Sequence, residues 1–249
     1  VFKAITMAAG IDSGKITPQT TYVDTGSLTI NGRTIQNYDV KTHGPYGVAT
    51  MTNVIEHSIN TGAVFAERQI GRDIFTRYVK SFGFDEKTGI DLPGELSGDL
   101  RRLNPKERDI AFATASYGQG VAVTPIQLIS AITAIANGGN LMRPYLDSAL
   151  QPKIIRRVVN ESTAKQVTDM MISAVDKAGV AKINGYTIAG KTGTAFVPDF
   201  TRGGYTENVV NTYVGFGPAS DPRFVILIKL NEPAGAPVAG LTVVPAFRD

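Results

Sequence analysis

The chain has 249 residues, of which 43% are hydrophobic and 19% are charged, as is ordinary for a globular protein with a sizeable core. The net charge of +3 comes from lysines and arginines scattered along the sequence, a pattern that favours a solvated surface over a nucleic-acid site. With no cysteine, no run of about 18 apolar residues, and only His43 and His57 as histidines, we expect no disulfide, no membrane span and no metal site.

The first third of the chain is predicted to be mainly helical, with a loop-rich insertion. Residues 1–9 read as a helix already under way, and residues 10–47 carry turn residues that predict loops and a short hairpin around Asn31-Gly32. Residues 48–83 are expected to be helical and to end at Gly83.

The middle of the chain contains the clearest helix start. After a loop at 84–104, Thr124 can act as an N-cap, with proline at the next position and Gln127 completing a capping box. We expect one buried face on this helix, formed by four isoleucines: Ile126, Ile129, Ile132 and Ile135. Residues 162–178 predict a further amphipathic helix, whose inner residues are Val167, Met170, Met171, Ala174 and Val175.

The last part of the chain changes to a strand pattern. Residues 186–195, 209–217 and 223–230 are β-like, and Asp221-Pro222 separates the last two at hairpin distance. Helices followed by consecutive antiparallel strands predict an α+β fold, with a helical part over about 1–180 and a sheet part over about 185–249.

Two Lys-Thr-Gly triplets are candidates for chemistry. In the first predicted strand, Lys191 is followed by Thr192, Gly193 and Thr194, which supplies a cation, two hydroxyls and backbone N–H groups for a carboxylate and an oxyanion. Glycine within a strand often marks the close approach of a ligand. The second triplet, at 87–89, lies in a polar loop, and we expect it to have no catalytic role.

Two further candidates precede that strand. Ser58 and Asn60 are two residues apart after a helical stretch, so both side chains can turn into one site. His57 adjoins Ser58, but neighbouring side chains on a helix do not face each other, and we expect His57 to be a packing or surface residue. Lys3 has the spacing of an amine that accepts a proton from a serine three positions earlier, immediately before Val1.

Lys3, then Ser58-x-Asn60, then Lys191-Thr192-Gly193 resembles the penicillin-recognising serine enzymes, in the order of their three motifs. Residues 88–95 (Thr-Gly-Ile-Asp-Leu-Pro-Gly-Glu) and 116–128 are similar to loops of class B penicillin-binding proteins. The resemblance covers nearly the whole chain. We therefore expect residues 1–249 to form a partial transpeptidase domain.

The resemblance implies a β-lactamase/transpeptidase-like fold, in which an antiparallel sheet carries helices on its faces beside a helical subdomain. The family's sheet also uses two strands that precede the serine helix, so we expect an upstream part of the same protein to complete the fold. It further implies a membrane-anchored enzyme on the extracytoplasmic face of the bacterial inner membrane. Its expected partners are peptidoglycan stem peptides, β-lactam antibiotics and cell-wall synthesis proteins, without a cofactor.

The resemblance also implies roles for the candidate residues. The serine before Val1 would attack a D-Ala-D-Ala peptide, Lys3 would be its general base, and Ser58 would relay the proton to the leaving amine. Lys191 would be the third catalytic residue, which orients the terminal carboxylate and adds positive potential. The substrate-binding roles would fall to four residues: Asn60 on the substrate amide, Thr192 and Thr194 on the terminal carboxylate, and Gly193 beside them. The Thr194 N–H would form half of the oxyanion hole.

Three alternatives remain at the level of sequence. A D,D-carboxypeptidase or a β-lactamase would need a water activated for deacylation, and we identify no glutamate suited to that task. A catalytically inactive module would keep the fold to bind a β-lactam or a cell-wall synthesis partner. The residue before Val1 distinguishes an enzyme from such a module.

Overall fold

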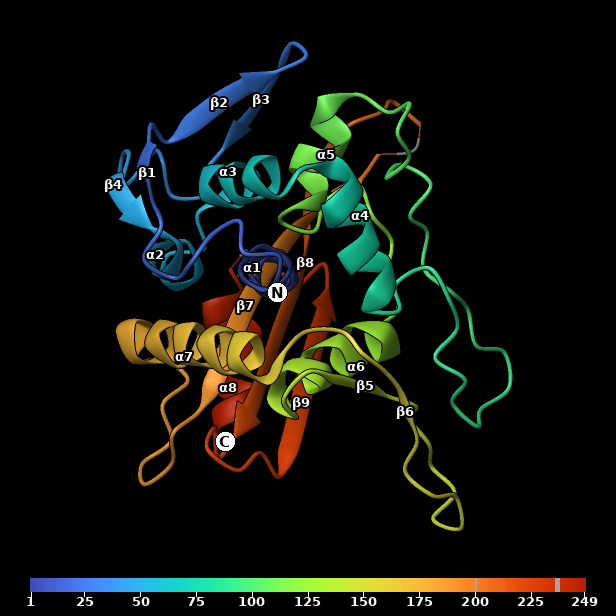
Figure 1. Cartoon of the computed structure of the whole chain (residues 1–249). Coiled ribbons are helices and arrows are strands. Elements are labelled where there is room, and N and C mark those ends of the chain that lie inside the picture. The colour runs from blue at the N-terminus through green and yellow to red at the C-terminus, as the bar shows by residue number, and fades with distance from the viewer. Residues whose placement is uncertain (200, 236–237) are drawn as a thin grey trace.

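The computed structural model describes residues 1–199, 201–235 and 238–249, and shows a mixed α+β architecture (Figure 1). The helices are α1 Lys3–Asp12, α2 Met51–Glu56, α3 Asn60–Ile70, α4 Arg72–Ser81, α5 Asp109–Ala115, α6 Pro125–Ala136, α7 Glu161–Ala178 and α8 Ala239–Arg248. The strands are β1 Thr21–Asp24, β2 Ser27–Ile30, β3 Arg33–Gln36, β4 Gly47–Thr50, β5 Asn140–Met142, β6 Ile154–Arg157, β7 Ala189–Pro198, β8 Tyr205–Gly217 and β9 Phe224–Asn231.

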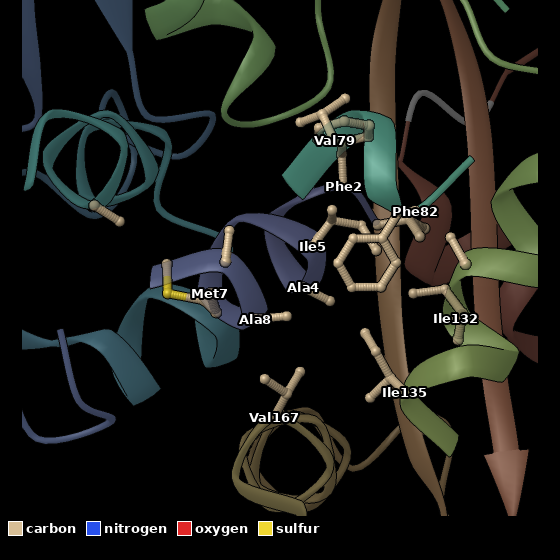
Figure 2. Packing of buried hydrophobic residues seen from close by; sticks show 14 of the residues in the cluster. Phe2, Ala4, Ile5, Met7, Ala8, Val79, Phe82, Ile132, Ile135 and Val167 are labelled. Carbon is tan, nitrogen blue, oxygen red and sulfur yellow. The ribbon is translucent and has the colours of Figure 1, made fainter. Parts of the chain in front are cut away.

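Helix α1 lies at the centre of the molecule. Its residues from Lys3 to Ile11 are all buried, and it contacts α2, α3, α4, α6 and α7. Figure 2 shows Ile5 of α1 near Phe82, while Val167 of α7 and Ile135 of α6 lie below Ala8. Apart from Lys3, Thr6 and Asp12 the helix is apolar, which is typical of the interior of a domain, so α1 is the element around which the others pack.

The main sheet is antiparallel and has the strand order β7-β8-β9. Val214 and Phe216 of β8 belong to the central core. Tyr213, the residue before Val214, belongs instead to the apolar cluster that includes the buried residues of α8. Successive side chains of a strand point to opposite faces. The sheet therefore has one face toward the helical core and one covered by α8 (Figure 1).

Three small antiparallel pairs complete the fold, and they join β1 with β4, β2 with β3, and β5 with β6. The β2–β3 hairpin turns at Asn31 and Gly32, both with positive φ, which confirms the predicted hairpin. The other two pairs, β1 with β4 and β5 with β6, were not predicted from sequence, because strands of three or four residues carry little periodicity.

Most predicted elements are confirmed, with shifted ends. Thr124 forms the predicted capping box with Gln127, and α7 buries its predicted face before Gly179. The strands predicted at 186–195, 209–217 and 223–230 correspond to β7, β8 and β9.

Other predictions were wrong in detail. The stretch 48–83 forms strand β4 and three separate helices, and the region predicted as sheet over about 185–249 ends in helix α8. The isoleucine face of α6 is only half right, because Ile132 and Ile135 are buried but Ile126 and Ile129 are half-buried. A strict repeat of three residues drifts around a helix of 3.6 residues per turn.

Replacing Thr124 with alanine should lower the free energy of unfolding of this domain by about 1 kcal/mol, because the N-cap oxygen for the Gln127 N–H is lost. Thr133→Ala is the matched control within α6. Within the described part of the chain, its hydroxyl bonds only to the Ile129 carbonyl of the same helix, so the effect of its loss should stay within about 0.5 kcal/mol. Urea unfolding of the full-length protein measures both, and equal losses would contradict the capping role.

Candidate active site

The amine of Lys3 lies at the centre of the site and binds two of its other residues. Lys3 begins α1 and is 6% exposed. Its Nζ donates to the Asn60 Oδ1 at 2.8 Å and to the Ser58 Oγ at 3.3 Å. The structure thus brings together three residues that the sequence singled out from positions more than fifty residues apart.

Ser58 occupies a tight turn between α2 and α3. Its φ of 58° lies in the left-handed region, which non-glycine residues seldom adopt and which costs on the order of 1–3 kcal/mol. The turn is held by the Ile59 N–H, which donates to the Val54 carbonyl at 3.0 Å. This unusual backbone lets a serine and the first residue of α3, Asn60, both approach Lys3.

The side chain of Asn60 is oriented by a partner at each end. Its Oδ1 accepts from Lys3, and its Nδ2 donates to the Gln36 carbonyl at 2.8 Å. One N–H of the amide nitrogen and one acceptor direction of the oxygen remain for a further partner by valence. The amide can therefore hold Lys3 and still bind a peptide group.

Strand β7 supplies the other wall of the site. Lys191 is 3% exposed, and its Nζ lies 3.4 Å from both the carbonyl oxygen and the hydroxyl of Thr192. The Val1 nitrogen donates to the same Thr192 carbonyl at 3.0 Å, so this carbonyl points away from β8. Since strand residues two apart present their backbone groups on the same side, Thr194 directs its N–H to that edge.

Gly193 is required by a close approach, as the sequence suggested, but the neighbour is the protein itself. A β-carbon at Gly193 would lie 2.5 Å from the Thr212 Oγ1 and 3.0 Å from the Val1 nitrogen. Any side chain here would push the start of α1 away from β7. The glycine therefore sets the spacing between the helix that carries Lys3 and the strand that carries Lys191.

Both lysines are shifted toward their neutral forms. Burial lowers the pKa of Lys3 well below its ordinary value, and the positive charge of Lys191 lowers it further. Burial alone lowers the pKa of Lys191 to about 8. An amine with a lowered pKa, 3.3 Å from a hydroxyl, is suited to accept and pass on a proton near neutral pH.

Tyr117 is a site residue to which the sequence gave no individual role. Its ring centroid lies 5.7 Å from the Lys3 Nζ, within the range of a cation–π contact. Burial raises the pKa of its hydroxyl. The only sequence signal was its place in the Ser-Tyr-Gly-Gln-Gly segment, which carried the family resemblance but indicated no contact.

The second Lys-Thr-Gly triplet lies in a loop, as predicted. The backbone and hydroxyl of Thr88 donate to one oxygen of the Glu95 carboxylate at 2.6 and 2.5 Å, and the Gly89 N–H donates to the other at 3.0 Å. These bonds close the loop 88–95 on itself. A structural role therefore accounts for this copy.

His57 packs beside the site, as expected for a packing residue. Its ring lies 4.8 Å from that of Tyr46, and its Nε2 is 3.9 Å from the Glu56 carboxylate. Burial lowers the pKa of His57. Among the residues that the structure describes, no group of three His, Cys, Asp or Glu side chains is placed to hold a metal ion.

The chain is similar to known proteins over nearly its whole length. Residues 1–248 match the family model for the penicillin binding protein transpeptidase domain. The chain is 34% identical over 261 residues to stage V sporulation protein D of Bacillus subtilis, covering 97% of this chain and 39% of that protein. It is 30% identical over 248 residues to the probable peptidoglycan D,D-transpeptidase FtsI of Caulobacter vibrioides, covering 94% and 41% respectively.

A solved structure shows the same fold over the whole chain. The crystal structure of penicillin-binding protein 3 from Mycobacterium tuberculosis, complexed with aztreonam, superposes with a TM-score of 0.84 at 28% identity and covers 99% of this chain and 59% of that one. The chain thus spans about two fifths of the two curated relatives. The chain belongs to the penicillin-binding protein transpeptidase family, in its class B branch.

Proposed function

We propose that the protein containing this chain is a peptidoglycan D,D-transpeptidase, which cross-links stem peptides through an acyl-serine intermediate and is inhibited by β-lactams. The observation that carries the proposal is the buried Lys3 amine, in contact with Ser58 and Asn60 and under the charge of Lys191. The relative named as a probable D,D-transpeptidase and the relative solved with aztreonam support the same activity.

The nucleophile in this proposal is a serine immediately before Val1. The Val1 nitrogen lies 3.0 Å from the Thr192 carbonyl, so a residue attached there sits beside β7. A helix places residues three apart on one face, which brings that serine to the side of Lys3. Neutral Lys3 takes its proton as the serine oxygen bonds to the carbonyl carbon of the penultimate D-alanine.

Collapse of the tetrahedral intermediate breaks the peptide bond to the terminal D-alanine. The proton held by Lys3 passes through Ser58, 3.3 Å away, to the leaving amine. An amine of a neighbouring stem peptide then attacks the acyl-enzyme, loses its proton back along the same path, and releases the serine. The new amide is the cross-link, and no redox step or cofactor enters the balance.

The β7 wall has a binding role. Lys191 and the hydroxyls of Thr192 and Thr194 bind the terminal carboxylate of the donor peptide, beside Gly193. The Thr194 N–H, on the edge that faces Val1, contributes half of the oxyanion hole. Asn60 uses its remaining donor and acceptor positions for the peptide amide.

An upstream part of the same protein is proposed to complete the sheet. Within the described residues, β9 pairs only with β8, so its other edge presents unpaired backbone groups, and three of its apolar side chains are exposed on one face of the strand: Phe224, Ile226 and Leu230. A long apolar edge strand is otherwise an aggregation hazard. A strand from upstream would cover it.

The cellular setting is also proposed by relationship. No helix in the described part of the chain is long and apolar enough to cross a membrane. We infer that the protein acts at the extracytoplasmic face of the bacterial inner membrane, with cell-wall synthesis proteins as partners, because its relatives include FtsI and stage V sporulation protein D.

A hydrolytic activity is less well supported by the site. Glu67 is the one carboxylate on α3, and burial raises its pKa to about 7. It lies seven residues beyond Asn60, on the order of 10 Å along the helix axis. That separation does not place it beside Ser58 as a base for water.

Incubation of the full-length protein with a fluorescent penicillin should give a covalent adduct on the residue before Val1, located by peptide mass spectrometry. Lys191→Ala and Ser58→Ala should each slow acylation by roughly 10²–10³-fold, as for loss of one transition-state donor. Lys87→Ala, in the second Lys-Thr-Gly triplet, is the matched control and should stay within twofold. An adduct on Ser58 itself, or equal losses in Lys87→Ala and Lys191→Ala, would refute these assignments.

The acylation rate should show a bell-shaped dependence on pH. It rises as Lys3 loses its proton, because only the neutral amine is a base, and it falls near pH 8 as Lys191 loses the charge that holds the carboxylate. Lys191→Arg keeps a charge at that position throughout, so the alkaline fall should disappear even if the overall rate drops. Stopped-flow acylation from pH 6 to 10 tests this, and an unchanged alkaline limb in the arginine variant would exclude Lys191 as its source.

The penicillin adduct should persist for hours, because a transpeptidase site activates an amine and not a water. Its decay can be followed by mass spectrometry after removal of free penicillin. Turnover within seconds to minutes would instead identify a β-lactamase, and release of D-alanine from a donor peptide without an acceptor would identify a carboxypeptidase.

A further inference from the structure

Three buried polar side chains lie directly behind Asn60 and take no part in the proposed chemistry. They are Asp24 at the end of β1, Asn37 just after β3, and Thr61 in the first turn of α3, and each is at most 3% exposed. Burying a carboxylate is costly unless hydrogen bonds compensate for the lost water. This buried cluster adjoins Asn60, which binds the Lys3 amine, so its effect on the site can be followed contact by contact.

The Asp24 carboxylate is fully engaged by donors. Asn37 Nδ2 donates to its two oxygens at 3.0 and 3.1 Å, the Thr61 hydroxyl donates at 2.5 Å, and the Tyr46 N–H donates at 2.8 Å. Burial tends to raise the pKa of Asp24, but the donors from Thr61, Tyr46 and Asn37 bring it below its ordinary value. The group is therefore a carboxylate that accepts hydrogen bonds only.

This charge fixes the orientation of the Asn37 amide. Because the NH2 end points at the carboxylate, the Oδ1 end points at α3, where it accepts from the Asn60 N–H at 3.0 Å and the Thr61 N–H at 3.1 Å. The residue at the N-cap position of α3 is Ile59, which has no polar side chain to cap the helix. Asn37 supplies that cap from a distant segment.

The neighbouring residue holds the Asn60 side chain as well. The Gln36 carbonyl accepts from Asn60 Nδ2 at 2.8 Å, while the Asn37 side chain accepts from the Asn60 backbone. With backbone and amide both fixed by residues 36–37, the Asn60 Oδ1 is left facing the Lys3 amine at 2.8 Å. Hydrogen bonds thus connect Asp24 through Asn37 to the backbone of Asn60, and the side chain of Asn60 in turn binds Lys3.

We propose that Asp24 and Asn37 are positioning residues for the transpeptidase reaction, which set the place of Asn60 against Lys3. The inference rests on the proposed function for its catalytic consequence. Displacing reacting groups by about 1 Å can cost about 10²-fold in rate, so these residues act on the acylation step without touching substrate.

The two residues can be tested by exchange as well as by removal. Asn37→Ala leaves the Asn60 and Thr61 N–H groups uncapped. Asp24→Asn replaces the carboxylate with an amide, so the charge that holds the Asn37 NH2 group is lost. The Asn37 oxygen is then no longer fixed toward α3. The double exchange, Asp24→Asn with Asn37→Asp, restores one carboxylate and one amide in the same contact. Thr61, whose hydroxyl is 3.2 Å from Asn37 Oδ1, keeps an acceptor in that variant.

Val64→Ala is the matched control, because Val64 is fully buried on the same helix but belongs to a separate apolar cluster with Ile30, Ile35 and Ala113. It weakens the packing of α3 without altering the hydrogen bonds of Asp24 or Asn37. The experiment compares full-length variants by three measurements: the melting temperature, the acylation rate at saturating fluorescent penicillin together with the noncovalent affinity, and the hydrogen exchange of the amides of residues 60 and 61.

We expect Asn37→Ala and Asp24→Asn to lower the saturating acylation rate at least about tenfold, with noncovalent affinity changed less than threefold. The exchange of amides 60 and 61 should accelerate beyond that in Val64→Ala, and the double exchange should recover at least fivefold in rate over either single variant. The proposal is overturned if the acylation rate of Asn37→Ala is within twofold of the wild-type rate. It is also overturned if Asn37→Ala and Val64→Ala lose the same melting temperature and the same fraction of the acylation rate. A double exchange no faster than the slower single variant overturns the pairing.

Hydrogen exchange separates this inference from the proposed function. A wild-type protein that no penicillin acylates would refute the transpeptidase assignment, while protection of amides 60 and 61 would still report on the cap. Unchanged protection in Asn37→Ala would refute the positioning role even in a protein that is acylated normally.

Discussion

Placing an amine inside the hydrophobic core is the constraint on which this structure depends. Lys3 lies on a helix that is buried from Lys3 to Ile11 and is itself 6% exposed, so water has little access to its charge. The fold answers with a small set of oxygens, from Ser58 and Asn60, and with a second buried lysine that disfavours the charged state of the first. Asn37 and the Gln36 carbonyl hold Asn60 at hydrogen-bond distance from this amine.

The elements that meet at Lys3 come from distant parts of the chain, and this explains what the sequence could and could not predict. Local signals were sufficient for the Thr124 capping box, the Asn31-Gly32 turn and the amphipathic face of α7, because each depends on residues within a few positions. The shared site of Lys3, Ser58 and Lys191 was predicted only through the family resemblance, since no periodicity relates residues so far apart.

What the sequence concealed is mostly polar and buried. An aspartate and an asparagine in a turn-rich stretch read as loop residues, yet Asp24 and Asn37 are each 2% exposed. Nothing in their neighbours along the chain announces a cap for a helix that begins more than twenty residues later. Tyr117 was missed for a related reason, because its contact with Lys3 depends on the return of the chain after α5. Such networks require the tertiary fold before they can be identified.

The left-handed backbone of Ser58 has a consequence for how this site can change. At a φ of 58°, a glycine would relieve strain that every residue with a β-carbon must bear. Replacement with glycine would therefore remove the hydroxyl and at the same time lower the conformational energy of the native backbone. The greater conformational entropy of the unfolded chain would partly offset this gain in stability. The position is one where selection for folding alone and selection for acyl transfer favour different residues.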